Sequence, residues 1–249
     1  MKRMILTLAL LFASGSALAG EAVTYQAEGG DFEGYYAPAL DGSPRGLVLV
    51  IHDWDGLTDY EERRADMLAA MGYDAFAVDL YGKGNRPEAI EDRKAETGKL
   101  YQDRERMRAL ILAGLETARG RTGAARTVVM GYCFGGAATL ELARSGKAED
   151  VAGYATFHGG LATPEGQSYP QSTAPILIAH GGADESISLD DAADLAKRLE
   201  GAGVPYELEV YSGAPHAFTV FGSDRYREDA DRKSWSSFTN FLDRHLPAS

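Results

Sequence analysis

The sequence predicts an α/β protein in which helices flank a mostly parallel, doubly wound sheet. Short apolar runs rich in β-branched residues alternate with longer stretches of helical periodicity along the chain. Several of the apolar runs are continuous rather than alternating, which is typical of parallel strands covered on both faces. Because strands and helices take turns, each strand is expected to cross over and rejoin the same sheet.

The expected sheet contains six core strands and an edge hairpin. Residues 21–45 place several aromatic side chains around Gly29 and Gly30, a pattern that predicts a hairpin at the entry edge of the sheet. The six core strands are expected at residues 46–52, 75–80, 127–132, 151–157, 175–180 and 206–211.

Five helices are expected between and after these strands. The longest has apolar residues such as Met107, Leu110, Ile111 and Leu115 on one stripe, which favours an amphipathic helix packed on the sheet. The five helices are expected at residues 59–71, 98–119, 134–145, 189–202 and 225–246.

Length, composition and charge limit the class of protein. The chain has 249 residues, 45% of them hydrophobic, which suits a single domain spanning residues 20–249. The formal net charge of -12 argues against a nucleic-acid partner, since phosphate binding requires a basic face. A small-molecule substrate is expected instead, from the motifs described below. The oligomeric state is left open, with a monomer favoured.

The first 19 residues predict a secretory signal peptide. Lys2 and Arg3 precede a short apolar run, and small residues end at Ala19 in an A-x-A pattern, where cleavage is expected. The run is too short for a spanning helix, so no stable membrane insertion is expected after cleavage, although a retained anchor is the alternative. The mature protein is expected in the periplasm or outside the cell. There it carries a single cysteine, which cannot form an internal disulfide.

That cysteine lies in a motif typical of a catalytic nucleophile. The segment GYCFGG directly follows an expected strand and directly precedes an expected helix, so Cys133 occupies the position of the serine in a nucleophile elbow. Gly131 and Gly135 remove side chains that would clash at this sharp turn. The alternatives are a small buried cysteine in a glycine-rich turn or a dinucleotide-binding loop. The second is disfavoured because the GxGxxG spacing is absent.

Two further residues stand where an α/β-hydrolase places its acid and its histidine. Asp184 and His216 follow the strands at 175–180 and 206–211, in the order nucleophile, acid, histidine. Taken singly, Asp184 is also a candidate helix N-cap and His216 a plain loop histidine. His158 precedes the acid and so breaks the order. The remaining histidines fit the role less well by position; they are His52, His180 and His245.

These residues predict hydrolysis through a thioester acyl-enzyme. His216 is expected to take the thiol proton, or to share an ion pair with the thiolate, while Asp184 orients the imidazole. The backbone N–H groups of Phe134 and Trp54 are expected to form the oxyanion hole.

The motifs VIHDWDGL, AVDLYGKG, GYCFGG, FHGGL, HGGAD and APHAF together resemble the dienelactone hydrolase family. The resemblance runs from about residue 25 to residue 246. It implies an α/β-hydrolase fold, no metal or organic cofactor, and Cys133, Asp184 and His216 as the catalytic residues.

The resemblance also implies roles for residues around the nucleophile. Asp53 falls where the family has a carboxylate that holds the resting cysteine; an exposed loop aspartate is the alternative. Family members that cleave dienelactone bind the substrate carboxylate with arginines. One of these corresponds to Val220 here. Arg104 is a candidate for the other, and Arg106 and Arg108 are the alternatives to it. Because valine cannot pair with a carboxylate, a neutral ester or lactone is an equally good expectation.

Aromatic side chains near these loops supply the remaining pocket candidates. Tyr81 and Phe218, with Trp54 and Phe134, are expected to line an apolar substrate pocket, although aromatic residues are core residues at least as often.

Three rival functions remain open from the sequence. One is a peptidase-like or acyl-transferring relative, and another is a redox-sensing protein that uses Cys133 without hydrolysis. The third is a non-catalytic binding module of the same fold.

Overall fold

The computed structural model describes residues 20–247. The expected signal peptide at residues 1–19 and its cleavage site lie outside the described residues.

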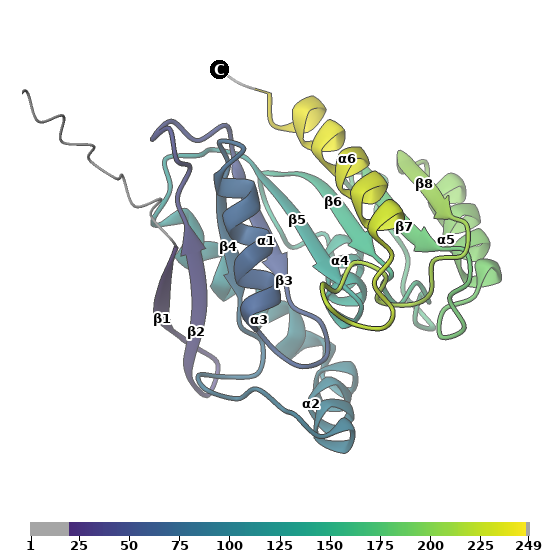
Figure 1. Ribbon diagram of the computed structural model, residues 1–249, viewed down its shortest axis with the longest axis horizontal. Helices are drawn as coiled ribbons and strands as arrows, with labels where there is room; N and C mark the ends of the chain where they lie inside the picture. The colour runs from purple at the N-terminus through teal and green to yellow at the C-terminus, as the bar shows by residue number, and fades with distance from the viewer. Residues whose placement is uncertain (1–19, 248–249) are drawn as a thin grey trace, which may run out of the picture.

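The described chain forms one eight-stranded sheet in the order β1-β2-β4-β3-β5-β6-β7-β8 (Figure 1). Strands β1 and β2 form the expected antiparallel hairpin, and β2 pairs antiparallel with β4. The other six strands, in the sheet order β4-β3-β5-β6-β7-β8, are mutually parallel. The strands are β1 (Glu21–Ala27), β2 (Gly30–Ala37), β3 (Leu47–Ile51), β4 (Asp74–Val78), β5 (Thr127–Tyr132), β6 (Val151–Phe157), β7 (Ile176–Gly181) and β8 (Tyr206–Tyr211).

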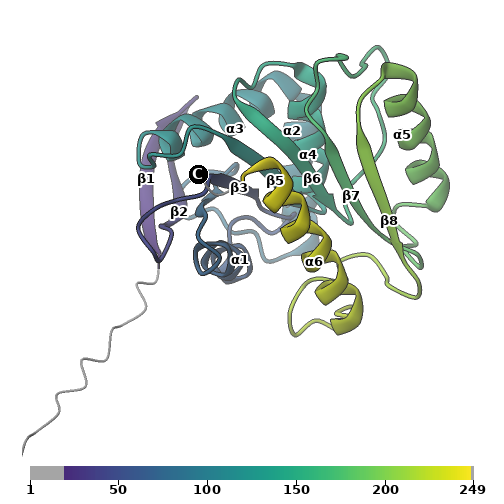
Figure 2. The same cartoon turned by 90° about the horizontal axis from the view of Figure 1, so that it is seen from above.

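Helices cover both faces of this sheet, so the doubly wound α/β architecture is confirmed. Figure 2 shows α1 and α6 on one side and α3, α4 and α5 on the other. Within residues 20–247, none of these helices combines the length and the apolar character needed to cross a membrane. The helices are α1 (Asp59–Ala69), α2 (Ile90–Gln102), α3 (Arg104–Arg119), α4 (Phe134–Ser145), α5 (Leu189–Ala202) and α6 (Glu228–His245).

The core explains why the parallel strands read as continuous apolar runs. All five residues of β3, and all five of β4, are buried because helices pack on both of their faces. The edge strand β8 is different, since only Tyr211 of its six residues is buried. The buried centre of the sheet therefore fixes the positions at which the loops after β3, β5 and β7 leave it.

The single helix expected at residues 98–119 is wrong. The structure has two helices there, which meet at Asp103. The Asp103 carboxylate accepts a hydrogen bond from the Arg106 backbone N–H (2.9 Å), so this residue caps α3 and ends α2. Only Leu100 of α2 is buried, which explains why the sequence shows little apolar periodicity in its first half. The last helix also begins three residues later than expected, at Glu228.

Candidate active site

Three loops at the carboxyl ends of parallel strands bring Cys133, His216 and Asp184 together. Cys133 follows β5, Asp184 follows β7, and His216 follows β8. His216 Nε2 lies 3.1 Å from Cys133 Sγ, and His216 Nδ1 lies 2.8 Å from Asp184 Oδ2. With the Nδ1 proton donated to the carboxylate, Nε2 is left free to accept the thiol proton. The three side chains therefore form a continuous hydrogen-bonded chain.

Cys133 occupies a strained turn between β5 and α4. Its backbone has φ 49° and ψ -110°, a region that residues other than glycine rarely adopt. Two glycines make the turn possible. A Cβ atom on Gly131 would lie 2.2 Å from the Gly135 carbonyl oxygen, and one on Gly135 would lie 2.2 Å from the Ile51 carbonyl oxygen. The backbone segments therefore approach closely, and this fixes the direction of the sulfur.

Asp184 is held as an ionised carboxylate. Its Oδ1 accepts hydrogen bonds from the backbone N–H groups of Ser186 (2.8 Å) and Ile187 (2.9 Å), while Oδ2 accepts from His216. Burial raises the pKa of Asp184, but the hydrogen bonds from His216 and the two N–H groups outweigh it and hold the pKa below its ordinary value. The alternative of a plain helix N-cap is wrong, because Ser188 caps α5.

Cys133 is held as a neutral thiol. Burial, together with the nearby charge of Asp53, raises the pKa of Cys133 to about 12, whereas a hydrogen bond from the Phe134 backbone N–H lowers it. The N-terminus of α4, where Cys133 lies, favours the thiolate. In the folded protein, burial outweighs that effect. The raised pKa of the thiol therefore favours transfer of its proton to His216 during attack over a resting ion pair.

The loop between β3 and α1 also lies near the Cys133 sulfur. Asp53 is buried, with 7% of its surface exposed, so the alternative of an exposed loop aspartate is wrong. Its Oδ1 accepts from the Asp55 N–H (3.1 Å), and its own N–H donates to Glu61 Oε1 (3.3 Å). The intervening Trp54 N–H donates to no group among residues 20–247. Between Asp53 and Asp55, the Trp54 N–H is therefore a free donor.

The carboxyl groups of Asp53, Asp55 and Glu61 form an acidic cluster in which Asp53 and Glu61 are buried and Asp55 is half-buried. One oxygen from each lies within 4.8 Å of the others, a spacing that suits a metal ion. Backbone N–H groups already donate to Asp53 and Glu61, including that of Thr58 (2.9 Å), and Arg93 lies 3.7 Å from Asp55. Burial and repulsion raise the pKa of Glu61 to about 7 and that of Asp53 well above its ordinary value. Donors from the protein thus satisfy part of the cluster.

A cavity of about 240 Å³ opens directly onto the sulfur. Its walls are mainly aromatic and apolar, with hydroxyl groups from three residues, Thr97, Tyr101 and Ser186. The lining residues are Trp54, Thr97, Tyr101, Cys133, Phe134, Gly160, Ser186, Ile187 and His216.

Three residues expected in the substrate pocket do not line this cavity. Tyr81 packs behind it, with its hydroxyl donating to the Trp54 carbonyl (3.1 Å). Arg104 is paired with Glu141 (2.9 Å). Phe218 is fully buried beside Tyr211, because Ala217 has a φ of 62° and turns the chain away from the cavity.

Five lining residues escaped the sequence analysis. Thr97 and Tyr101 reach the cavity from α2, whose first half the sequence did not predict. Gly160, Ser186 and Ile187 lie on the loops after β6 and β7. Only the position of these loops at the carboxyl ends of strands signalled their involvement.

The other histidines have structural positions. His52 is buried and accepts a hydrogen bond from the Leu80 N–H (3.2 Å). His180 lies within β7, and the His245 ring packs on Phe241 at 4.3 Å. His158 is adjacent to His216, with ring centroids 5.4 Å apart, but its Nε2 is bonded to Thr219 Oγ1 (2.8 Å).

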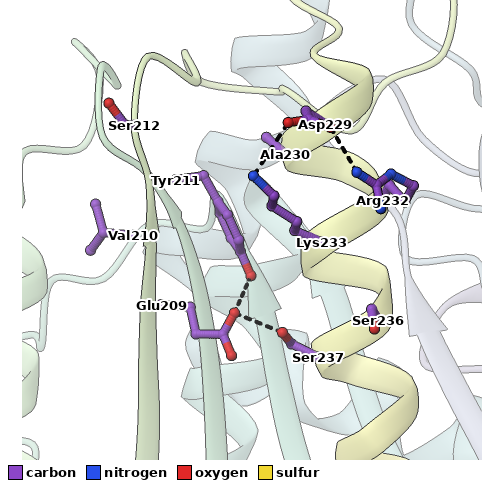
Figure 3. Close-up of a pocket in the computed structure, with 10 residues that line it drawn as sticks. All are labelled: Glu209, Val210, Tyr211, Ser212, Asp229, Ala230, Arg232, Lys233, Ser236 and Ser237. Atoms are coloured by element: carbon purple, nitrogen blue, oxygen red, sulfur yellow. Dashed lines mark hydrogen bonds and ion pairs between the residues drawn. The ribbon is translucent and has the colours of Figure 1, made fainter.

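A larger hollow of about 550 Å³ lies at the sheet edge between β8 and α6. Figure 3 shows its polar side chains bonded to one another. Glu209 accepts from the Tyr211 and Ser237 hydroxyls, and Asp229 pairs with Arg232 and Lys233. These lining residues include neither a cysteine nor a histidine, so the smaller cavity, where a thiol meets an imidazole, is the candidate active site.

A mostly parallel sheet flanked by helices, with Cys133, Asp184 and His216 in the loops after β5, β7 and β8, is the architecture of an α/β-hydrolase. The family model for the dienelactone hydrolase family matches residues 32–246, and the chain belongs to that family. It is therefore a hydrolase of a lactone- and ester-cleaving family.

Named relatives and solved structures are similar to this chain along most of its length. A putative carboxymethylenebutenolidase of Aquifex aeolicus is 26% identical and covers 91% of this chain and 99% of its own. A probable 2-oxo-3-(5-oxofuran-2-ylidene)propanoate lactonase of a Bradyrhizobium species is 27% identical, covering 80% of this chain and 84% of its own. The crystal structure of a dienelactone hydrolase-like promiscuous phosphotriesterase from metagenomic libraries superimposes with a TM-score of 0.83 at 25% identity, covering 92% and 99% of the two chains.

Proposed function

We propose that this protein hydrolyses a small ester or lactone through a thioester formed on Cys133. The observation that carries the proposal is the hydrogen-bonded chain from Asp184 through His216 to Cys133 Sγ. Nucleophilic catalysis by a thiol requires a base within hydrogen-bonding reach and a third group that orients the base. Those three functions correspond to the three side chains.

In the first step His216 Nε2 removes the proton of Cys133 as the sulfur attacks the carbonyl carbon. The carbonyl π electrons move onto oxygen, and a tetrahedral intermediate forms. As the intermediate collapses, the carbon–oxygen bond of the ester breaks, and the alkoxide leaves with the proton held by His216. In the second step His216 deprotonates water, which attacks the thioester and releases the carboxylic acid and the thiol. Asp184 stabilises the imidazolium in both steps.

Two backbone N–H groups stabilise the oxyanion in this proposal. The Phe134 N–H lowers the pKa of the adjacent Cys133 thiol and lies at the N-terminus of α4, where the helix dipole favours negative charge. The Trp54 N–H is the free donor between two N–H groups that carboxylates occupy. Glu61 therefore leaves Trp54 available by holding the loop on either side of it.

Asp53 is proposed to keep the resting thiol protonated. No hydrogen bond joins it to Cys133 among the described residues, so it acts through its charge. Removing a proton from the thiol while Asp53 is ionised would place two negative charges in one buried region. This protects the cysteine until substrate binds.

The Asp53→Asn variant is expected to react faster with iodoacetamide than the wild type at pH values where Asp53 is ionised. Asp53 raises the pKa of the thiol, so its removal lowers that pKa and increases the thiolate fraction at a given pH. The measurement is the alkylation rate of Cys133 as a function of pH, with Asp41→Asn, before β3, as the matched control. An unchanged pH dependence in Asp53→Asn would show that Asp53 does not restrain the thiol.

The substrate is proposed to be uncharged near its reacting carbonyl. None of the residues that line the cavity is a lysine or an arginine, and Arg104 is already paired with Glu141. Val220 stands four residues after His216 and offers no partner to a carboxylate. A flat acyl group against Trp54, Tyr101 and Phe134 suits these walls.

A substrate panel tests the proposed function. Turnover is expected for p-nitrophenyl acetate and for small lactones, with a methyl-ester lactone preferred over its free carboxylate and no cleavage of a peptide p-nitroanilide. The Cys133 thiolate leaves the tetrahedral intermediate more readily than an alkoxide does, so the substrate needs a good leaving group to compete with it. This favours esters over amides. Cleavage of the anilide at the ester's rate would point to a peptidase instead. Reversible oxidation of Cys133 without turnover of any ester would point to a redox-sensing protein.

A further inference from the structure

The loop that carries His216 is held from behind by a buried polar network outside the cavity. We call it the Arg64 network. It consists of Tyr60 and Arg64 from α1, His158 after β6, Thr219 after β8, and Asp231 from α6. Three other segments therefore converge on the loop after β8.

Arg64 is the centre of the network. Its side chain is fully buried, forms an ion pair with Asp231, and donates a hydrogen bond to the Thr219 carbonyl (3.0 Å). Burying a guanidinium costs free energy unless its charge and its donors are satisfied. This indicates that Arg64 does more than fill space. Four aromatic rings lie within cation–π distance of it; they belong to Tyr60, Tyr132, Phe221 and Trp235.

Thr219 links this centre to the histidines. It is fully buried and lies three residues after His216. Its Oγ1 lies 2.6 Å from the Tyr60 hydroxyl and 2.8 Å from His158 Nε2, while its carbonyl accepts from Arg64. Both its side-chain hydroxyl and its carbonyl oxygen are therefore bonded to groups on other segments.

His158 transmits this restraint to His216. The two rings meet edge to face, with centroids 5.4 Å apart and planes at 66°. Burial, together with the adjacent His216, lowers the pKa of His158 well below its ordinary value. A neutral His158 neither competes for the thiol proton nor repels the imidazolium that forms on His216 during the reaction.

The loop needs such a restraint because its backbone is strained. Ala217, next to His216, has φ 62°, and His158, on the neighbouring loop after β6, has φ 39°. Residues other than glycine hold such conformations only where the surrounding structure determines them. The strain lies beside the imidazole that must reach both Cys133 Sγ and Asp184.

We propose that the Arg64 network is a positioning device for His216. Acting through the Thr219 hydroxyl and the His158 ring, it keeps the imidazole within reach of the thiol and the carboxylate at once. This inference rests on the proposed function, since it assigns the network to the same reaction. None of its members lines the cavity, so the network acts on His216 and not on the substrate.

The test compares Thr219→Val with Thr219→Ser on p-nitrophenyl acetate. Valine keeps the shape of threonine but loses the hydroxyl, whereas serine keeps the hydroxyl. We expect kcat to fall by about 10- to 100-fold in Thr219→Val with KM unchanged, because small misplacement of a catalytic group has effects of this size. We expect Thr219→Ser to retain most of kcat. Thr173→Val, which removes a buried hydroxyl on the loop before β7, is the control and should leave kcat unchanged.

Two results would overturn the inference. One is a Thr219→Val enzyme that loses thermal stability but keeps the wild-type kcat, and the other is a Thr219→Ser enzyme as impaired as the valine variant. If Thr219→Val does not fold, Tyr60→Phe decides by the same criterion, since it removes only the hydroxyl that contacts Thr219. Failure of the proposed function is distinguishable, because the wild type itself would then not cleave the ester.

Discussion

Replacing Cys133 with alanine is expected to lower the turnover of p-nitrophenyl acetate by at least about three orders of magnitude, the scale on which loss of a catalytic nucleophile acts. The cavity opens onto one nucleophile with a base in contact, since His216 Nε2 lies 3.1 Å from Cys133 Sγ. Without the sulfur, His216 can activate only water, and the thioester route is lost. Steady-state kinetics on the purified variant measure the effect.

The control for this prediction is the fold of the variant. Alanine at residue 133 inherits the same backbone strain as cysteine, so the thermal unfolding temperature should stay close to that of the wild type. A folded Cys133→Ala enzyme with more than about a tenth of wild-type turnover would exclude this residue as the nucleophile, because general-base activation of water alone does not recover so much.

Replacing Gly135 with alanine is expected to destabilise the protein by about 3 kcal/mol or more and to abolish activity. The added Cβ atom would lie 2.2 Å from the Ile51 carbonyl oxygen and 2.4 Å from that of His52. Both are backbone atoms at the end of β3, which pairs with β5, so neither can move without disturbing the centre of the sheet. Urea unfolding followed by circular dichroism measures the change.

Gly98→Ala is the matched control for that substitution. Gly98 lies inside α2, and a Cβ atom there would meet nothing within 4 Å. Alanine should stabilise the helix by about 0.5–1 kcal/mol, because glycine is a poor helix former. Equal effects of the two substitutions would mean that the close approach at Gly135 does not limit stability.

The sequence predicts the sheet well because its central strands are buried on both faces. The strands at residues 127–132, 151–157 and 206–211 have the expected bounds, and the order of motifs after β5, β7 and β8 depends only on chain connectivity. Parallel strands end at one edge of the sheet, so residues in loops at those ends are brought together whatever their side chains. This is why Cys133, Asp184 and His216 were identifiable as a group.

The substrate cavity was harder to predict because its walls depend on local backbone turns. Phe218 and Tyr81 have the aromatic character of pocket residues, yet a positive φ at Ala217 sends one into the core, and a hydrogen bond to Trp54 holds the other behind the lining. Tyr101 reaches the cavity from a helix that ends at Asp103, and a capping bond of this kind leaves little trace in hydrophobic periodicity. The raised pKa of Cys133 likewise depends on burial, which composition does not reveal.

The most direct test of the central claim is to look for the acyl group on Cys133. The enzyme is mixed with p-nitrophenyl acetate, quenched in acid during turnover, digested and analysed by mass spectrometry. We expect one acetyl group on the peptide that contains Cys133, and hydroxylamine should remove it. In Cys133→Ser the same peptide should carry no thioester. Full turnover with Cys133 unmodified at every quench time, and the acyl group on another residue, would contradict it.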